Sequence, residues 1–206
     1  YDDILVDNDG ILYAKNFRKG IDHNTFSLEK NYLILGGLGT GKTAVIDYLK
    51  EFSADQNVIP LVAKFETAYS AEDISHKFYQ SLRGKIKTYI RLNNTTMTEL
   101  PMTFGQSELL LSLDEIFNQK NNNLKGFFIF IEDLHKQKDI QLSFDFISGL
   151  QMLNEELYDF GLPASIIISG TSDWEDKFKN DPRLTSVVEL NNIIKLPDVT
   201  PSLAAK

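Results

Sequence analysis

The residues with the clearest chemical potential form a glycine-rich loop inside the stretch 31–52. Four glycines and a Lys-Thr pair match the pattern G-x-x-x-x-G-K-[ST]. The glycines allow a curled backbone whose N–H groups converge on one point, as a polyphosphate requires. The lysine adds a point charge for the β- and γ-phosphates, and the threonine hydroxyl is a ligand for Mg²⁺. The pattern predicts a nucleotide-binding loop made of Gly36, Gly37, Leu38, Gly39, Thr40, Gly41, Lys42 and Thr43.

The sequence on both sides of this loop predicts the elements that must position it. Residues 32–35 are an apolar run short enough for a buried strand. After the loop, Val45, Ile46, Leu49 and Phe52 recur at helical spacing. A helix that starts there places the positive end of its dipole beneath the phosphates. The order strand, glycine loop, helix separates this motif from an ordinary glycine-rich turn.

Two acids follow the most apolar run of the chain. Residues 126–131 are typical of a central parallel strand that is buried on both faces. Ligands of open α/β sheets bind at the carboxyl ends of such strands, where Glu132 and Asp133 emerge. We assign Glu132 to the Mg²⁺ shell beside Thr43, and Asp133 to the orientation of the attacking water. His135 is interpreted as a surface or hydrogen-bonding residue, because a magnesium site of this kind takes oxygen ligands.

The rest of the chain alternates between strand-like runs and helical stripes. Pro60 gives the first part of one strand an edge position, because proline cannot donate to a ladder. Residues 70–73 and 172–175 each have the pattern of a capping box at the start of a helix. The expected strands cover 57–65, 164–171 and 186–190, and the expected helices cover about 74–90, 106–118 and 139–160, with a short one after 172 and a loop over 93–105.

The far end of the first long helix is basic. It carries Arg83, Lys85, Lys87 and Arg91. A solvated helix face and a patch for a phosphate backbone or a partner are both consistent with this pattern.

Composition limits the classes of function. The chain has 206 residues and a net charge of −8, which argues against a surface wholly dedicated to nucleic acid but leaves room for a local basic patch. It has no cysteine, which excludes disulfides and thiolate metal sites and fits a reducing, cytoplasmic location. No apolar run approaches the roughly 20 residues of a membrane helix, so we expect no membrane partner.

The division of the chain follows from these patterns. We expect an N-terminal lead-in over 1–30, a single α/β core over 31–196 and a mobile tail over 197–206. Because the sequence begins with Tyr1 rather than Met, we expect a fragment of a longer protein.

The segment IFIEDLH, followed by a helix and then by IIISGTS, resembles the ATPase core of the AAA+ and STAND proteins. The resemblance covers about 31–196 and is nearest in character to origin-recognition and transposon-helper ATPases. It implies a three-layer P-loop NTPase fold with five parallel strands in the order 5-1-4-3-2. It also implies that Thr171 senses the γ-phosphate. A small hydroxyl at the end of a strand beside the acidic one would face the same phosphates.

Several residues depart from the pattern of that family. The second motif reads Glu-Asp where Asp-Glu is usual, so Asp133 is one methylene shorter than the usual glutamate. Thr171 replaces the more usual asparagine. The helical lid expected after the fifth strand is absent from this chain, which implies either a fragment of a larger protein or the loss of the lid. Arg183 lies near the position of an arginine finger, and a salt bridge there is an equally open interpretation.

Three functions are consistent with the sequence. The first is a switch or assembly ATPase that uses ATP and Mg²⁺, self-associates or joins a larger assembly, and acts on DNA or protein through flanking domains. The second is a small-molecule phosphotransferase, for which the sequence shows no arginine-rich lid. The third is a nucleotide-binding interaction module with little hydrolysis.

Overall fold

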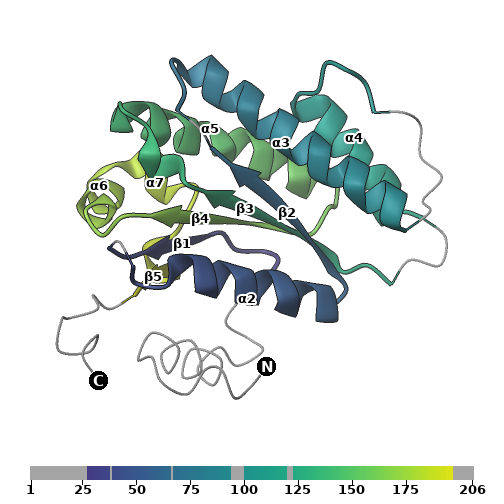
Figure 1. Ribbon diagram of the computed structural model, residues 1–206, viewed down its shortest axis with the longest axis horizontal. Coiled ribbons are helices and arrows are strands. Elements are labelled where there is room, and N and C mark those ends of the chain that lie inside the picture. Colours follow the sequence, from purple (N-terminus) through teal and green to yellow (C-terminus); the bar gives the residue numbers. More distant parts are fainter. Residues whose placement is uncertain (1–26, 38, 66, 94–99, 120–122, 197–206) are drawn as a thin grey trace.

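The computed structural model describes residues 27–37, 39–65, 67–93, 100–119 and 123–196 (Figure 1). Four expectations fall wholly or partly on other residues, and one of them is the loop over 93–105, of which residues 94–99 are not described. Most of the lead-in, the tail over 197–206 and Leu38 of the glycine loop lie outside the described residues.

The helices and strands alternate along the described chain as an α/β fold requires. In chain order they are β1 (Tyr32–Leu35), α2 (Lys42–Asp55), β2 (Val58–Lys64), α3 (Ala71–Leu92), α4 (Gln106–Phe117), β3 (Gly126–Glu132), the 3₁₀ turn η2 (Leu134–Lys136), α5 (Ile140–Asp159), β4 (Ala164–Gly170), α6 (Trp174–Asn180), α7 (Pro182–Thr185), the 3₁₀ turn η3 (Leu190–Asn192) and β5 (Ile193–Lys195).

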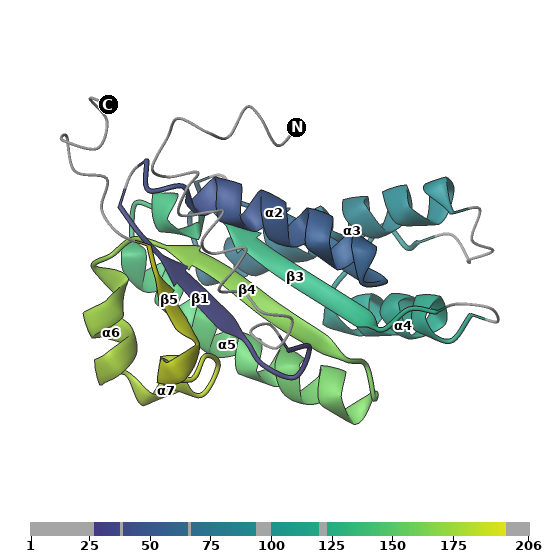
Figure 2. The same cartoon turned by 90° about the horizontal axis from the view of Figure 1, so that it is seen from below.

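The five strands form one parallel sheet in the order β2-β3-β4-β1-β5 (Figure 2). This is the predicted order 5-1-4-3-2 read from the other edge, so the fold prediction is confirmed. Strand β2 lies at an edge, as Pro60 requires. Because β4 lies between β3 and β1, the segments that follow these three strands meet at one edge of the sheet.

Helices cover both faces of the sheet and make three layers (Figures 1 and 2). Helix α2 packs on one face through Val45, Ile46 and Leu49, which are buried against alternate residues of β1, β3 and β4. Helices α3, α4 and α5 cover the other face, against the intervening strand residues. Successive side chains of a strand point to opposite faces, so each strand supplies both cores.

Helix α3 forms as its sequence predicts. The hydroxyl of Ser70 accepts a hydrogen bond from the backbone N–H of Asp73, and the Asp73 carboxylate accepts one from the N–H of Tyr69. The first bond satisfies a donor that the helix itself leaves open. The second ties the residue before the N-cap to the first turn, one position earlier than a capping box requires. Its stripe of every fourth residue is buried from Ile74 to Ile86.

The predicted strand over 186–190 is wrong, because this segment continues a helical turn. Asp181 caps α7 by accepting from the N–H of Arg183, and Pro182 occupies the first turn. The N–H groups of Val187 and Val188 then bond to the carbonyl of Leu184, so both valines are buried without joining the sheet. The fifth strand is instead β5, which pairs with β1.

The short helix after residue 172 exists as α6, but its expected capping box does not form. Asp173 is the N-cap and its side chain makes no capping bond. The carboxylate of Glu175 is paired instead with Lys179 and Lys195. Ion pairs with the next turn and with β5 therefore replace the expected bond to the cap. Among the described residues, no helix is long and apolar enough to cross a membrane.

Candidate nucleotide-binding site

The glycine loop has a backbone that side chains would disturb. Gly39 and Gly41 have φ values of 76° and 86°, in the left-handed region that favours glycine. A Cβ on Gly36 would lie 2.3 Å from the hydroxyl oxygen of Thr40. That hydroxyl donates to the carbonyl of Gly37 at 3.0 Å and closes the loop on itself. At these three positions, the glycines are required by the observed backbone and its contacts.

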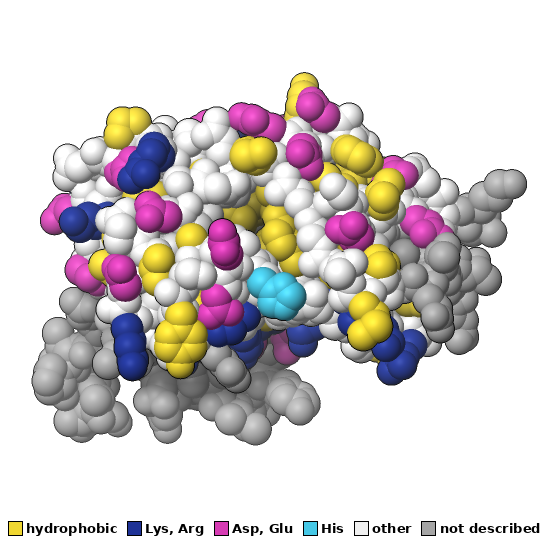
Figure 3. Space-filling model, turned by 90° about the horizontal axis from the view of Figure 1, so that it is seen from above, with side chains coloured by type: hydrophobic (Ala, Val, Ile, Leu, Met, Phe, Trp, Pro, Cys, Tyr) yellow, Lys and Arg dark blue, Asp and Glu magenta, His cyan; other side chains and the backbone are white. Residues whose placement is uncertain are grey.

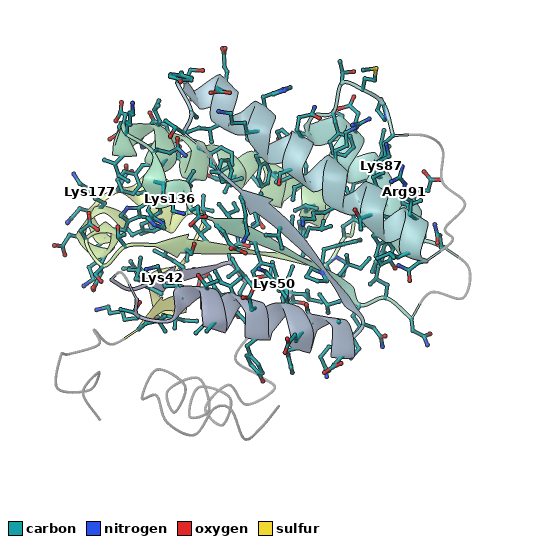
Figure 4. All side chains as sticks on the ribbon, in the orientation of Figure 1. Lys42, Lys50, Lys87, Arg91, Lys136 and Lys177 are labelled. Atoms are coloured by element: carbon teal, nitrogen blue, oxygen red, sulfur yellow. The ribbon has the colours of Figure 1, made fainter. Side chains whose placement is uncertain are left out.

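Lys42 is the first residue of α2 and its side chain folds back over the loop (Figure 4). Its ammonium donates to the carbonyls of Gly36 and Gly37 at 2.6 and 2.7 Å. Burial lowers the pKa of Lys42, and the nearby carboxylate of Asp133 opposes that shift. No side chain caps the N-terminus of α2, so its first N–H groups have no side-chain acceptor. The exposed side chain of Thr43 lies in the same turn.

The sheet brings the predicted site residues to one edge. The loop follows β1, the acids end β3, and Thr171 comes one residue after β4. The N–H of Gly36 lies 3.4 Å from the carbonyl of Gly170, which joins the start of the loop to the end of β4. Thr171 thus follows the strand that separates the loop from the acids. The parallel topology unites residues that are about 130 positions apart in the sequence.

Asp133 faces the loop side of this edge. Its backbone is left-handed, with a φ of 65°, at the point where β3 gives way to η2. Its carboxylate pairs with Lys136 at 3.0 Å and acts electrostatically on Lys42. Lys42 and Lys136 lie at the same end of the molecule in Figure 4. Asp133 therefore lies within electrostatic reach of Lys42, and its role toward a phosphate stays a prediction.

Glu132 has partners that sequence reasoning missed. It is buried, and its two carboxylate oxygens pair with Lys50 of α2 at 2.6 Å and Lys64 of β2 at 3.3 Å. Burial disfavours the charged form of Lys50, yet hydrogen bonds to Glu132 and Asp47 hold its pKa above the usual value. Two sequence features pointed to this cluster. Lys50 lies seven residues, or two helical turns, after Thr43, and Lys64 ends the strand that pairs with β3.

His135 is partly buried, and its Nδ1 is buried without a hydrogen-bond partner, so this nitrogen does not make the hydrogen bond that was one of the two interpretations of the residue. Burial lowers the pKa of His135, and the charge of Lys42 adds to this effect, while Asp133 opposes it. The ring therefore lies within electrostatic reach of the candidate site.

Arg183 forms the salt bridge that was one of its two interpretations. Its guanidinium bonds to both carboxylate oxygens of Asp181, at 3.1 and 2.7 Å, and lies 3.7 Å from Asp145. The side chain is 58% exposed, so a polyanion presented by another molecule can reach it. A role across a subunit interface stays a prediction.

The basic end of α3 lies apart from this site. Figure 4 places Lys87 and Arg91 at the end of α3 that is distant from Lys42. Figure 3 looks onto the α3 and α5 side of the molecule, where acidic side chains are scattered and Lys and Arg lie mainly toward the margins. Arg83 is used internally, since it donates to the carbonyls of Leu100 and Pro101. The partner patch at this end stays a prediction.

The residues present can be compared with what a nucleotide and Mg²⁺ need. The loop, the open start of α2 and Lys42 suit a chain of phosphates. Among the described residues no three acids or histidines cluster as a metal cage. Mg²⁺ in phosphate sites usually takes one or two protein oxygens and completes its shell with phosphates and water. The Thr43 hydroxyl and one acid fit that need, provided that the acid is not held by another cation.

The sheet order, the glycine loop and the acids at one edge define the fold of a P-loop nucleoside triphosphatase. Solved structures agree. One matching chain, from Drosophila ORC bound to GC-rich DNA and Cdc6, has a TM-score of 0.64 and 10% identity, over 98% of this chain and 31% of that one. Another, from Drosophila ORC bound to DNA, has a TM-score of 0.61 and 9% identity, over 96% of this chain and 32% of that one.

These likenesses are of fold, because the identities are low. The chain spans about a third of the length of the two matching chains. The sequence matches no protein-family model, and it matches no curated protein.

Proposed function

We propose that this chain binds ATP at the glycine loop and hydrolyses it with Mg²⁺, as a switch or assembly ATPase. The observation that carries the proposal is the folded-back Lys42, whose ammonium is held by two loop carbonyls at the uncapped start of α2. A polyphosphate offers the Lys42 ammonium charged acceptors at the same place, and these are stronger than the two carbonyls.

In this proposal each residue at the edge has a separate task. Lys42 and the first N–H groups of α2 bind the β- and γ-phosphates. Thr43 and Glu132 hold the metal, which when bound neutralises phosphate charge. Asp133 orients the attacking water and accepts its proton. Thr171 donates its hydroxyl to the γ-phosphate, which the position of β4 beside both β1 and β3 supports.

Assembly is the second part of the proposal. The matching structures are described as complexes bound to DNA, one of them with Cdc6. We infer that this chain also works within a larger assembly, with DNA or protein engaged through flanking domains. The exposed Arg183 would then be donated to the ATP site of a neighbour, where such an arginine contributes on the order of 10³-fold in turnover.

Mixing two inactive variants tests the donated arginine. Arg183→Ala protein keeps an intact ATP site, and Lys42→Ala protein keeps an intact Arg183. If Arg183 acts across subunits, some mixed interfaces pair the two intact parts, and ATP turnover partly recovers. If both variants fold and assemble but the mixture stays inactive, Arg183 has only its salt-bridge role.

A nucleotide-binding module with little hydrolysis is the second candidate, and one observation favours it. Glu132 is held by two lysines and Asp133 by one, so both acids are engaged by cations of the chain itself. Phosphate release from ATP, with Asp133→Asn as the comparison, separates the candidates. A hydrolase should lose roughly 10²- to 10⁴-fold in rate in Asp133→Asn while it keeps its affinity for ATP. A wild-type protein that binds ATP and releases phosphate no faster than Asp133→Asn would be the binding module.

A further inference from the structure

The cluster of Lys50, Glu132 and Lys64 joins three elements at one buried carboxylate. Lys50 reaches Glu132 from α2 at 2.6 Å, and Lys64 reaches it from β2 at 3.3 Å. The Glu132 side chain is only 6% exposed. The Lys50 ammonium also lies 5.9 Å from the centre of the Phe130 ring. Phe130 and Glu132 are two residues apart on β3, so their side chains share the face of the strand along which Lys50 lies.

A buried carboxylate needs this compensation. An acid without a partner in such a position pays a large desolvation cost, and a cation that pairs with it offsets that cost. In this chain two lysines supply the compensating charge, and each takes a different carboxylate oxygen. The acid assigned to Mg²⁺ therefore already has two cationic partners.

We propose that Lys50 and Lys64 are an internal counter-cation for Glu132 that competes with Mg²⁺, and that this competition sets the Mg²⁺ concentration that ATP binding requires. The proposal rests on the proposed function, because it concerns the metal that accompanies ATP. A cation and an ammonium group cannot share the same carboxylate lone pairs without strong repulsion. Metal binding at the Glu132 oxygen that Lys50 occupies thus requires that Lys50 withdraw, and the nearby ammonium repels a metal at the other oxygen.

The surroundings of both lysines allow that withdrawal. The Lys50 ammonium is shared with Asp47, at 2.9 Å on the exposed side of α2, and that partner remains when Glu132 is lost. The Lys64 side chain is 61% exposed and can pass into water. When the two lysines withdraw from Glu132, neither ammonium is therefore left both buried and unpaired. This is the arrangement expected of an exchangeable ion pair rather than a permanent structural one.

The test measures binding of a fluorescent ATP analogue as a function of Mg²⁺ concentration. In Lys50→Met the competing ammonium is gone, so half-maximal enhancement of binding should need about tenfold less Mg²⁺, as expected for the loss of one charge-assisted hydrogen bond. Lys64→Met should shift it about twofold, because the Lys64 side chain is largely exposed and its distance to Glu132 is longer. Lys77→Met is the matched control, since Lys77 forms a partly buried pair with Asp73 on α3, and it should change nothing.

A double variant shows whether the effect passes through Glu132. In the Glu132→Gln background, Lys50→Met should no longer shift the Mg²⁺ requirement. A shift that persists there would mean a general field effect of the lost charge, and would overturn the proposal. An unchanged requirement in Lys50→Met alone would also overturn it, and would indicate that Glu132 stays with its lysines in the metal-bound state.

The same measurements distinguish this failure from failure of the proposed function. If the wild-type protein binds the analogue and Lys42→Ala does not, the loop is a nucleotide site whatever the lysines do. If wild type and Lys42→Ala are equally unable to bind it, with and without Mg²⁺, the proposed function and the competition both fail. A thermal melt with Mg²⁺ alone gives a reading without nucleotide. Mg²⁺ should stabilise Lys50→Met more than the wild-type protein, and equal stabilisation would count against the competition.

Discussion

The glycine loop and the acidic end of β3 contribute to one site in different ways. The contacts of the loop are local, because Lys42 and Thr40 bond to carbonyls three to six residues away. The contacts of Glu132 are long-range, because Lys50 lies 82 positions away in the sequence. A local motif carries its own geometry, whereas the state of an acid at a strand end depends on what neighbouring elements place beside it. The geometry of the loop can thus be predicted from its sequence motif, whereas the ion pairs of Glu132 can be predicted only from the fold.

The stability of the protein should reveal this difference most strongly at Glu132. Replacing Glu132 with Ala removes the link between α2, β2 and β3 and leaves the half-buried Lys50 with one partner fewer. Breaking a buried pair is costly, and because both lysines are partly exposed we expect a loss of about 2 kcal/mol in the free energy of unfolding. Urea denaturation measures it.

The control for that prediction is Lys179→Ala, which removes the exposed lysine of a pair within α6 and leaves Glu175 paired with Lys195. It should cost less than about 1 kcal/mol. If Glu132→Ala lowers the free energy of unfolding no more than this control does, the lysine cluster does not stabilise the fold. The proposed difference between the loop and the acidic end of β3 would then be wrong.

A smaller effect should separate the glycines of the loop from those of the helices. Gly41→Ala forces a side chain into a left-handed backbone and should destabilise by about 1 kcal/mol. Gly149→Ala, in α5, meets open space and a helical backbone, so it should stabilise by about 0.5–1 kcal/mol. Thermal melts of the two variants should therefore move in opposite directions. Shifts of the same sign would mean that the loop backbone is not held as described.

The smallest predicted effect is a pH dependence at His135, whose ring is within electrostatic reach of Lys42 in the loop and Asp133 at the end of β3. Its folded pKa is lowered by burial and by Lys42, so the unfolded chain binds its proton more readily. Stability should accordingly rise with pH through the window from the lowered folded pKa to about 6.5, and be lost on acidification. The charges that face the ring are Lys42, Asp133, Lys136 and Asp173. In His135→Gln the loss of stability on acidification should be smaller than in the wild-type protein. An unchanged dependence of stability on pH would mean that His135 does not cause it.

The sequence predicted the frame of the site better than its electrostatics. Apolar periodicity and the loop motif were enough for β1, α2 and β3, since buried strands and amphipathic helices have strong local patterns. The sheet order came from the family resemblance and agrees with the observed sheet. The segment over 186–190 was misread, because two buried valines in a helical turn look like part of a strand. The engaged state of Glu132 was also missed. Ion pairs between distant elements leave no periodic trace. The spacing of Lys50 after Thr43 and the place of Lys64 at the end of a strand therefore became informative only once the register of β2 against β3 was known.

The central claim is that the loop binds the phosphates of ATP through Lys42, and calorimetric titration with ATP tests it most directly. Lys42→Ala removes a charge-assisted contact and should weaken ATP binding by roughly 100-fold. Its melting temperature should stay close to that of the wild-type protein, because Lys42 lies outside both hydrophobic cores. Lys77→Ala should bind as the wild type does. Equal ATP affinity in Lys42→Ala and in the wild-type protein, with both folded, would contradict the account.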